Sequence, residues 1–110
     1  MAVNLAGASE TLIVWNRTRA KADAFAAEVA GTTVAGTPAE AASQAQVVVS
    51  MVADDAAAEA VHLGDEGTLV ADSAPQVVVE SGTIAPATAT RLASAAAERG
   101  IGFVDAPVSG

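Results

Sequence analysis

A chain of 110 residues with 52% hydrophobic residues has room for one domain with its own core. Its net charge of −8 argues against nucleic-acid binding through a broad basic face, and its lack of cysteine excludes disulfides and thiolate metal sites. No apolar run has the length of a membrane span and no signal peptide is visible, so we expect a cytoplasmic protein with no membrane partner.

Strand and helix signals alternate along the whole chain. The expected strands are apolar runs rich in β-branched residues, at 12–15, near 33–34, and at 47–52, 77–80 and 102–105. The expected helices begin at a capping residue or a proline and end near a glycine or a loop, at 19–29, from Pro38, from 54 to about 62, and at 86–99. Residues 1–5 also have a helical pattern.

The strands are continuously apolar, and residues 47–52 give the clearest signal of a buried strand. Such strands, separated by helices, predict an α/β fold with a doubly wound parallel sheet that is covered on both faces. Ligands of these folds bind beyond the carboxyl ends of the strands, so the residues that follow each strand are the candidates for a site.

The segment after the first strand, 16–21, gathers three of the five cationic residues of the chain. In dinucleotide-binding folds this position meets the adenine ribose, and an arginine there accommodates a 2′-phosphate. Arg17 offers a planar fork for phosphate, Thr18 a hydroxyl at a helix N-terminus, and Lys21 a second charge that reaches the same turn. The alternative is that Thr18 is a plain N-cap and the basic residues are ordinary surface.

The later turns carry weaker signals. Residues 52–55 border the expected cleft, although Asp54 and Asp55 are more simply helix-cap residues. Gly82 permits close backbone approach and Thr83 brings a hydroxyl to the cleft, unless this turn only caps the next helix. The Ser109-Gly110 turn can present N–H groups to a carboxylate. We expect His62 to be an ordinary surface residue, and we find no constellation typical of a metal site.

Together these turns resemble the β-hydroxyacid dehydrogenase family, which includes 3-hydroxyisobutyrate dehydrogenase, the NADP-binding domain of 6-phosphogluconate dehydrogenase and imine reductases. The resemblance covers the whole chain in order. Residues 1–5 are similar to the end of the family's glycine-loop helix, and residues 14–18 to its NADP-type second-strand end. Residues 51–55 are similar to its Met-Leu-Pro-Asp segment, and residues 80–86 to its Ser-Thr-Ile-Ser-Pro turn. Residues 105–110 are similar to the start of its substrate motif.

The resemblance implies a Rossmann-type domain that binds NADP. The residues that it implies for the adenosine 2′-phosphate are Arg17 and Thr18, and Asn16 and Lys21 of the same turn are further candidate cofactor-binding residues. The backbone of Met51, Val52 and Ala53 would line the cofactor, Thr83 would lie near the nicotinamide ribose, and Ser109 and Gly110 would bind a substrate carboxylate. The implied reaction is hydride transfer between NADPH and a small β-hydroxyacid or semialdehyde, in a protein that forms homo-oligomers through a further C-terminal domain. The alternatives are an imine reductase and a non-catalytic nucleotide-binding or scaffold module.

The sequence also departs from the family pattern. Ala53 replaces a proline and Gly82 a serine, which we expect to be mild, and Ala85 replaces a helix-capping serine at a cost of about 1 kcal/mol. The family's first strand and glycine-rich loop would precede Met1, and its catalytic lysine would follow Gly110. We therefore expect residues 1–110 to be a partial NADP-binding domain with no catalytic residue, inactive alone, marginally stable and prone to self-associate. Its sheet should be interrupted between 12–15 and 47–51.

Overall fold

The computed structural model describes residues 12–52, 54–71 and 73–107. Helices and strands alternate in the order β1 (Leu12–Val14), α1 (Arg19–Glu28), β2 (Thr32–Val34), α2 (Pro38–Ser43), β3 (Val47–Ser50), α3 (Asp55–Leu63), the short 3-10 helix η1 (Thr68–Val70), β4 (Val77–Glu80), α4 (Pro86–Glu98) and β5 (Gly102–Asp105). The predicted α/β alternation is confirmed, and η1 is the one described element that the sequence did not predict. The predicted helix at residues 1–5 lies outside the described residues.

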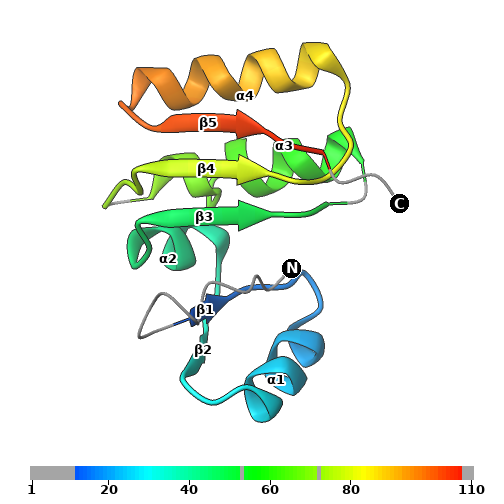
Figure 1. The fold of residues 1–110 in the computed structure, drawn as a ribbon, viewed down its shortest axis with the longest axis vertical. Helices are drawn as coiled ribbons and strands as arrows, with labels where there is room; N and C mark the ends of the chain where they lie inside the picture. Colours follow the sequence, from blue (N-terminus) through cyan, green and yellow to red (C-terminus); the bar gives the residue numbers. More distant parts are fainter. Residues whose placement is uncertain (1–11, 53, 72, 108–110) are drawn as a thin grey trace.

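All strand pairs are parallel, and they form two sheets (Figure 1). One contains β1 and β2, and the other has the order β3-β4-β5. Within the described part of the chain, β1 and β3 are not paired with each other, so the predicted interruption between these two strands is confirmed there. The order agrees with a Rossmann-type sheet, in which β1 and β3 flank the place of one further strand.

Each sheet has its own apolar cluster. The larger cluster comprises Leu69, Val78, Ala96 and Ile101, with Val48, Ala95 and Phe103 packed against it. The smaller cluster comprises Leu12, Val14 and Ala22, with Phe25 and Val34 packed against it. Alanine faces let α1 and α4 lie close to their strands, but a methyl group contributes little buried area, so the larger aliphatic side chains supply most of the hydrophobic stabilisation.

Residues 47–52 gave the clearest signal of a buried strand: the strand is confirmed at Val47–Ser50, but its predicted burial is wrong for most of its length. Val47 is 36% and Met51 40% exposed, whereas Val78 and Glu80 on β4 are fully buried. The reason is position in the sheet: β4 lies between β3 and β5, and β3 is at the edge of its sheet in the described residues. Continuous apolar sequence marks a strand but does not distinguish a central strand from an edge strand.

The helix ends follow the predicted capping chemistry, with one exception. Thr37 Oγ1 accepts the Glu40 N–H at 3.0 Å, and Asp54 Oδ1 accepts the Ala57 N–H at 2.8 Å. At α1, Thr18 is the N-cap residue but its side chain makes no capping bond. Asn16 Oδ1 instead accepts the Thr18 N–H at 2.8 Å, which fixes the turn that leads from β1 into α1.

Candidate cofactor site

The carboxyl ends of β3, β4 and β5 stand at one level. Ser50, Glu80 and Asp105 occupy corresponding positions in the three strands. Backbone hydrogen bonds continue just beyond them, because the Ser81 N–H donates to the Ser50 carbonyl at 2.7 Å and the Ala106 N–H donates to the Glu80 carbonyl at 2.9 Å. The turns that follow these strands therefore begin next to one another, at the edge where parallel α/β sheets bind ligands.

Gly82 brings the turn after β4 directly against the turn after β3. A Cβ atom at position 82 would lie 2.6 Å from the Val52 carbonyl oxygen and 2.9 Å from the Val52 nitrogen. Both atoms belong to the backbone and cannot rotate away. We expected the glycine in place of the family's serine to be a mild departure, but the contact shows that this arrangement requires glycine.

The predicted cofactor-facing residues of these two turns lie close together along this edge. Met51 is exposed, Val52 is half-buried and Thr83 is exposed. The Ala85 N–H donates to Asp55 Oδ1 at 2.7 Å, which ties the end of the second turn to the first turn of α3. Three predicted site residues, Ala53, Ser109 and Gly110, lie outside the described residues.

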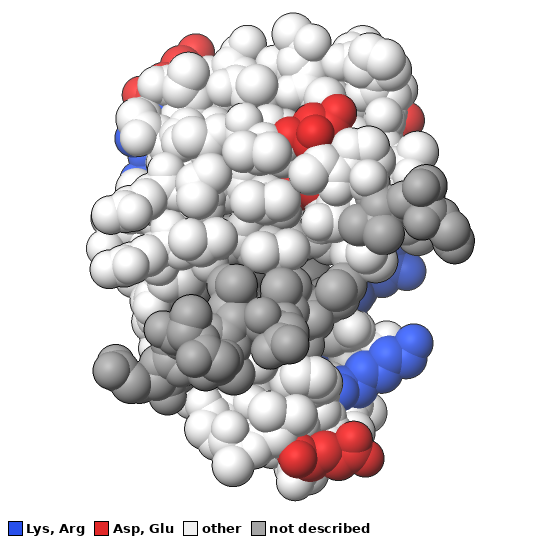
Figure 2. Space-filling view, in the orientation of Figure 1, with Lys and Arg blue, Asp and Glu red and all other residues white. Residues whose placement is uncertain are grey.

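The end of β1 presents a cationic surface. Arg17, Thr18 and Lys21 are exposed and Asn16 is half-buried. Figure 2 shows cationic side chains projecting close together at the right of the lower half, over α1 and the loop before it. In the described part of the chain, Arg19 pairs with Asp23 at 3.5 Å, and no carboxylate lies within ion-pairing distance of Arg17 or Lys21.

The prediction that His62 is a surface residue is wrong. Its side chain is fully buried on the inner face of α3, four residues after the buried Ala58. His62 Nδ1 lies 2.7 Å from Thr68 Oγ1, and His62 Nε2 lies 2.7 Å from Glu80 Oε1. The spacing from Ala58 was a signal that could have placed His62 on the inner face of the helix.

Glu80 is a fully buried carboxylate at the end of β4. Its Oε2 accepts the Gly82 N–H at 2.8 Å, and the Ser50 side chain also hydrogen-bonds to it. Burial alone would raise the pKa of the Glu80 carboxyl, but the hydrogen bonds from His62, Gly82 and Ser50 outweigh this effect and lower the pKa below its usual value. Sequence reasoning missed this residue because an acid that ends a strand is usually exposed.

Residues 1–110 match the family described as the NAD binding domain of 6-phosphogluconate dehydrogenase. The chain belongs to this family. This NAD-binding domain is 37% identical over 110 residues to an NAD-dependent L-serine dehydrogenase of Pseudomonas aeruginosa and covers 36% of that protein. It is 38% identical over 107 residues to the cytokine-like nuclear factor N-PAC of Danio rerio, covering 97% of this chain and 23% of that protein.

Solved structures agree with the Rossmann-type fold. A Mycobacterium tuberculosis 3-hydroxyisobutyrate dehydrogenase with L-serine is 28% identical with a TM-score of 0.80, over 97% of this chain and 35% of the other. An imine reductase of Myxococcus stipitatus in complex with NADP+ is 27% identical with a TM-score of 0.70, over 88% of this chain and 32% of the other. The NAD-binding domain therefore spans about a third of the length of these enzymes.

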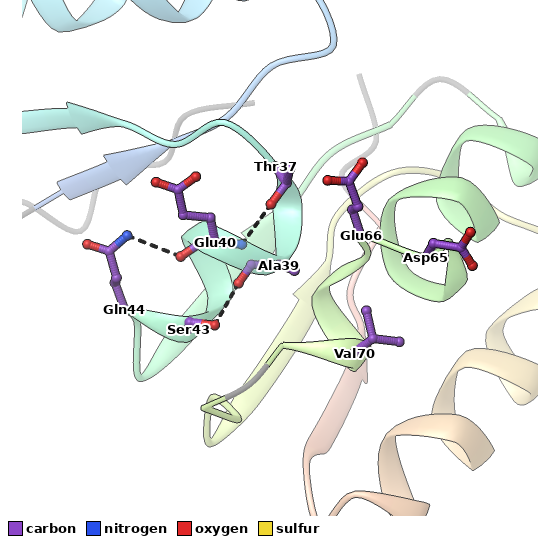
Figure 3. A pocket seen from close by; sticks show the side chains of 8 residues that line it. All are labelled: Thr37, Ala39, Glu40, Ser43, Gln44, Asp65, Glu66 and Val70. Carbon is purple, nitrogen blue, oxygen red and sulfur yellow. Dashed lines mark hydrogen bonds between the residues drawn. The ribbon is translucent and has the colours of Figure 1, made fainter.

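One cavity of this domain lies apart from the strand ends (Figure 3). It has a volume of about 440 Å³ and lies between α2 and the segment from the end of α3 to η1. Glu40, Asp65 and Glu66 line it, and none of the residues that follow β3, β4 or β5 does. Three carboxylates repel the phosphates of a dinucleotide, so this cavity does not suit the cofactor.

In the residues that the structure describes, no helix combines the length and apolar character that crossing a membrane would require.

Proposed function

We propose that this domain binds NADP(H) and that the β1–α1 turn binds the adenosine 2′-phosphate. The observation that carries the proposal is the pair of exposed cations Arg17 and Lys21 beside Thr18, at the end of β1, with no carboxylate in ion-pairing distance among the described residues. An acid at this position would bind the ribose 2′-hydroxyl and repel a phosphate, whereas an arginine favours the phosphate. Asn16 Oδ1, which accepts the Thr18 N–H, fixes the conformation of this turn before any ligand binds.

The relatives use both cofactors, so local residues have to decide the preference. The L-serine dehydrogenase relative is named as NAD-dependent, and the imine reductase structure contains NADP+. Among the described residues, the acid nearest to the turn in the sequence is Asp23, which is one turn into α1 and pairs with Arg19 rather than with the loop. This arrangement supports NADP over NAD.

The rest of the cofactor would follow the carboxyl edge of the larger sheet. The backbone of Met51, Val52 and Ala53 would line it, and Thr83 would contact the nicotinamide ribose. The bound cofactor supplies or accepts the hydride, and the protein orients it and keeps water away. The Ser109-Gly110 turn would hold the substrate carboxylate through its N–H groups.

We propose that the whole protein is a cytoplasmic, homo-oligomeric oxidoreductase of small β-hydroxyacids or their semialdehydes. The 3-hydroxyisobutyrate and L-serine dehydrogenases among the relatives support this substrate class. Two alternatives also have support. The imine reductase structure supports reduction of a C=N bond, and the N-PAC relatives, which are named as nuclear factors, support a nucleotide-binding or scaffold role. Turnover of β-hydroxyacids, of imines or of neither by the whole protein separates the three.

The test of the phosphate site compares 2′,5′-ADP with 5′-ADP by titration calorimetry on this chain. We expect 2′,5′-ADP to bind at least about tenfold more tightly, the size of one charge-assisted phosphate contact. Arg17→Ala should abolish the difference. Arg91→Ala, which removes an exposed arginine on α4 that pairs with Glu59 at 3.0 Å, should retain it. An Arg17→Ala variant that still prefers 2′,5′-ADP would show that the phosphate binds elsewhere.

A further inference from the structure

The turn after β4 is held by three hydrogen bonds to its backbone. The Ser81 N–H donates to the Ser50 carbonyl at 2.7 Å, and the Gly82 N–H donates to Glu80 Oε2 at 2.8 Å. The Ala85 N–H donates to Asp55 Oδ1 at 2.7 Å. Thr83 lies between these anchors with an exposed side chain. The turn is therefore fixed on both sides of the residue that we place at the nicotinamide ribose.

The Glu80 anchor is itself held from inside the protein. Glu80 Oε1 lies 2.7 Å from His62 Nε2, and His62 Nδ1 lies 2.7 Å from Thr68 Oγ1. An ionised carboxylate only accepts hydrogen bonds, so Nε2 carries the hydrogen, and in the neutral imidazole the Thr68 hydroxyl donates to Nδ1. All three side chains are buried, and the network leaves no ring nitrogen or carboxylate oxygen of His62 and Glu80 without a partner.

Such a network is poorly explained by stability alone. Apolar side chains of similar volume replace buried ionic and polar groups with little loss of stability, and often with a gain. What a fully satisfied buried network does provide is one fixed arrangement of its members. Here the two carboxylate oxygens have different tasks, because Oε1 bonds to His62 in the interior and Oε2 bonds to the Gly82 N–H in the turn.

We infer that the Thr68–His62–Glu80 network is a positioning device of the cofactor site, which holds the Gly82–Thr83 turn against Val52 so that Thr83 meets the nicotinamide half of the cofactor. The inference rests on the proposed function. His62 and Glu80 are positioning residues, since their side chains are fully buried and do not reach the surface that the cofactor would contact. Gly82 links them to the turn, because its N–H binds the Glu80 carboxylate and its lack of a side chain allows the close approach to Val52.

The experiment compares two variants of Glu80 with two ligands. Glu80→Gln can keep the network, because its amide oxygen can accept the Gly82 N–H while its NH₂ group donates to Nε2 of the other His62 tautomer. Glu80→Leu has a similar volume and cannot accept the Gly82 N–H. NADPH contains the nicotinamide half and 2′,5′-ADP lacks it, so the ratio of their dissociation constants on this chain reports that half alone.

We expect Glu80→Leu to weaken NADPH binding about tenfold, the loss of one preorganised contact, and to leave 2′,5′-ADP binding unchanged. Glu80→Gln should stay within about twofold of the wild type for both ligands. The Gly82 amide should exchange with solvent faster in Glu80→Leu and at the wild-type rate in Glu80→Gln. His62→Phe, which leaves the carboxylate without its interior partner, should behave like Glu80→Leu and serves if that variant does not fold.

A control separates positioning from loss of stability. Ile101→Ala opens a cavity next to β5, at the opposite end from the turn, and should lower the melting temperature with no change in the NADPH to 2′,5′-ADP ratio. If Glu80→Leu and Ile101→Ala change the ratio equally, or if neither Glu80→Leu nor His62→Phe changes it, the positioning inference is wrong and the cofactor proposal stands. If the wild-type chain binds neither ligand, the cofactor proposal itself fails and the inference fails with it.

Discussion

Gly82 is the residue at which the two turns of the candidate site are closest. We expect Gly82→Ala to destabilise the domain by about 1–3 kcal/mol, because its Cβ atom would meet the Val52 carbonyl oxygen and the backbone would have to move. Gly102→Ala is the matched control. Its nearest neighbours would be 3.5 Å away, an ordinary contact, so stability should stay the same or rise slightly. Urea unfolding of the three proteins measures the difference, and equal midpoints for the two variants would contradict the close contact.

Glu80 makes the stability of the domain depend on acidity. Its pKa is lowered in the folded state from an ordinary value of 4.5, so the unfolded chain takes up the proton at a higher pH than the folded chain. The stabilisation is complete above pH 4.5 and is lost as the pH falls through the lowered pKa. We expect the unfolding free energy, measured from pH 6 down to pH 3, to fall less steeply in Glu80→Gln than in the wild type. Parallel curves would show that the pKa of Glu80 does not change on folding.

The environment of His62 could not be predicted from the sequence, unlike that of the cations after β1. The cations at 16–21 could be located at the end of a strand because they follow it directly, and the structure places them exposed there, while their role in phosphate binding stays a prediction. The environment of His62 depends on Glu80, which is 18 positions away in the sequence. The spacing from Ala58 could indicate the inner face of the helix, but the partners Thr68 and Glu80 became visible only when α3, η1 and β4 were placed together.

At the scale of elements, the helix ends were well predicted because capping is local. Thr37 and Asp54 bind amides three residues ahead, a relation that the sequence displays directly. The 3-10 helix η1 was missed because Arg99 helps to fix it from the far end of α4, through hydrogen bonds to the carbonyls of Leu69 and Ala71. The exposed edge at β3 was expected from the predicted interruption of the sheet next to residues 47–51, although the apolar pattern of the strand by itself indicated burial.

The N-terminus of α4 offers a direct test of capping. Ala85 is its N-cap residue and has no side-chain oxygen to receive the amides of the first turn. We expect Ala85→Ser to raise stability by about 0.5–1 kcal/mol, because the hydroxyl can accept one of these hydrogen bonds. Ala93→Ser on the exposed side of the same helix should lower stability by a few tenths of a kcal/mol, roughly the difference in helix propensity. Thermal melting of both variants checks the prediction, which a destabilised Ala85→Ser would contradict.

At the scale of the whole molecule, the two apolar clusters share no residue. The cluster around β1 has three buried members, none larger than leucine, and the cluster around β4 is larger and lies in a three-stranded sheet. We therefore expect the β1–α1–β2 part to open more readily than the β3–β5 part. Native-state hydrogen exchange should give lower opening free energies for the amides of Ile13 and Val34 than for Val78. Equal values would show that the domain unfolds as a single unit.

Because β3, β4 and β5 end at corresponding positions in the sheet, insertions and deletions are tolerated at some places in this sequence and not at others. An extra residue inside one of these strands would advance the turn beyond it by about 3.3 Å and turn its later side chains to the opposite face. The donor and acceptor atoms of the hydrogen bonds from Ser81 to Ser50 and from Ala106 to Glu80 would then no longer lie opposite each other. Insertions and deletions among homologues should therefore be rare within β3, β4 and β5 and in the turns that directly follow these strands. They should collect instead in the segment between η1 and β4, where the chain enters the sheet from the end opposite the cofactor edge.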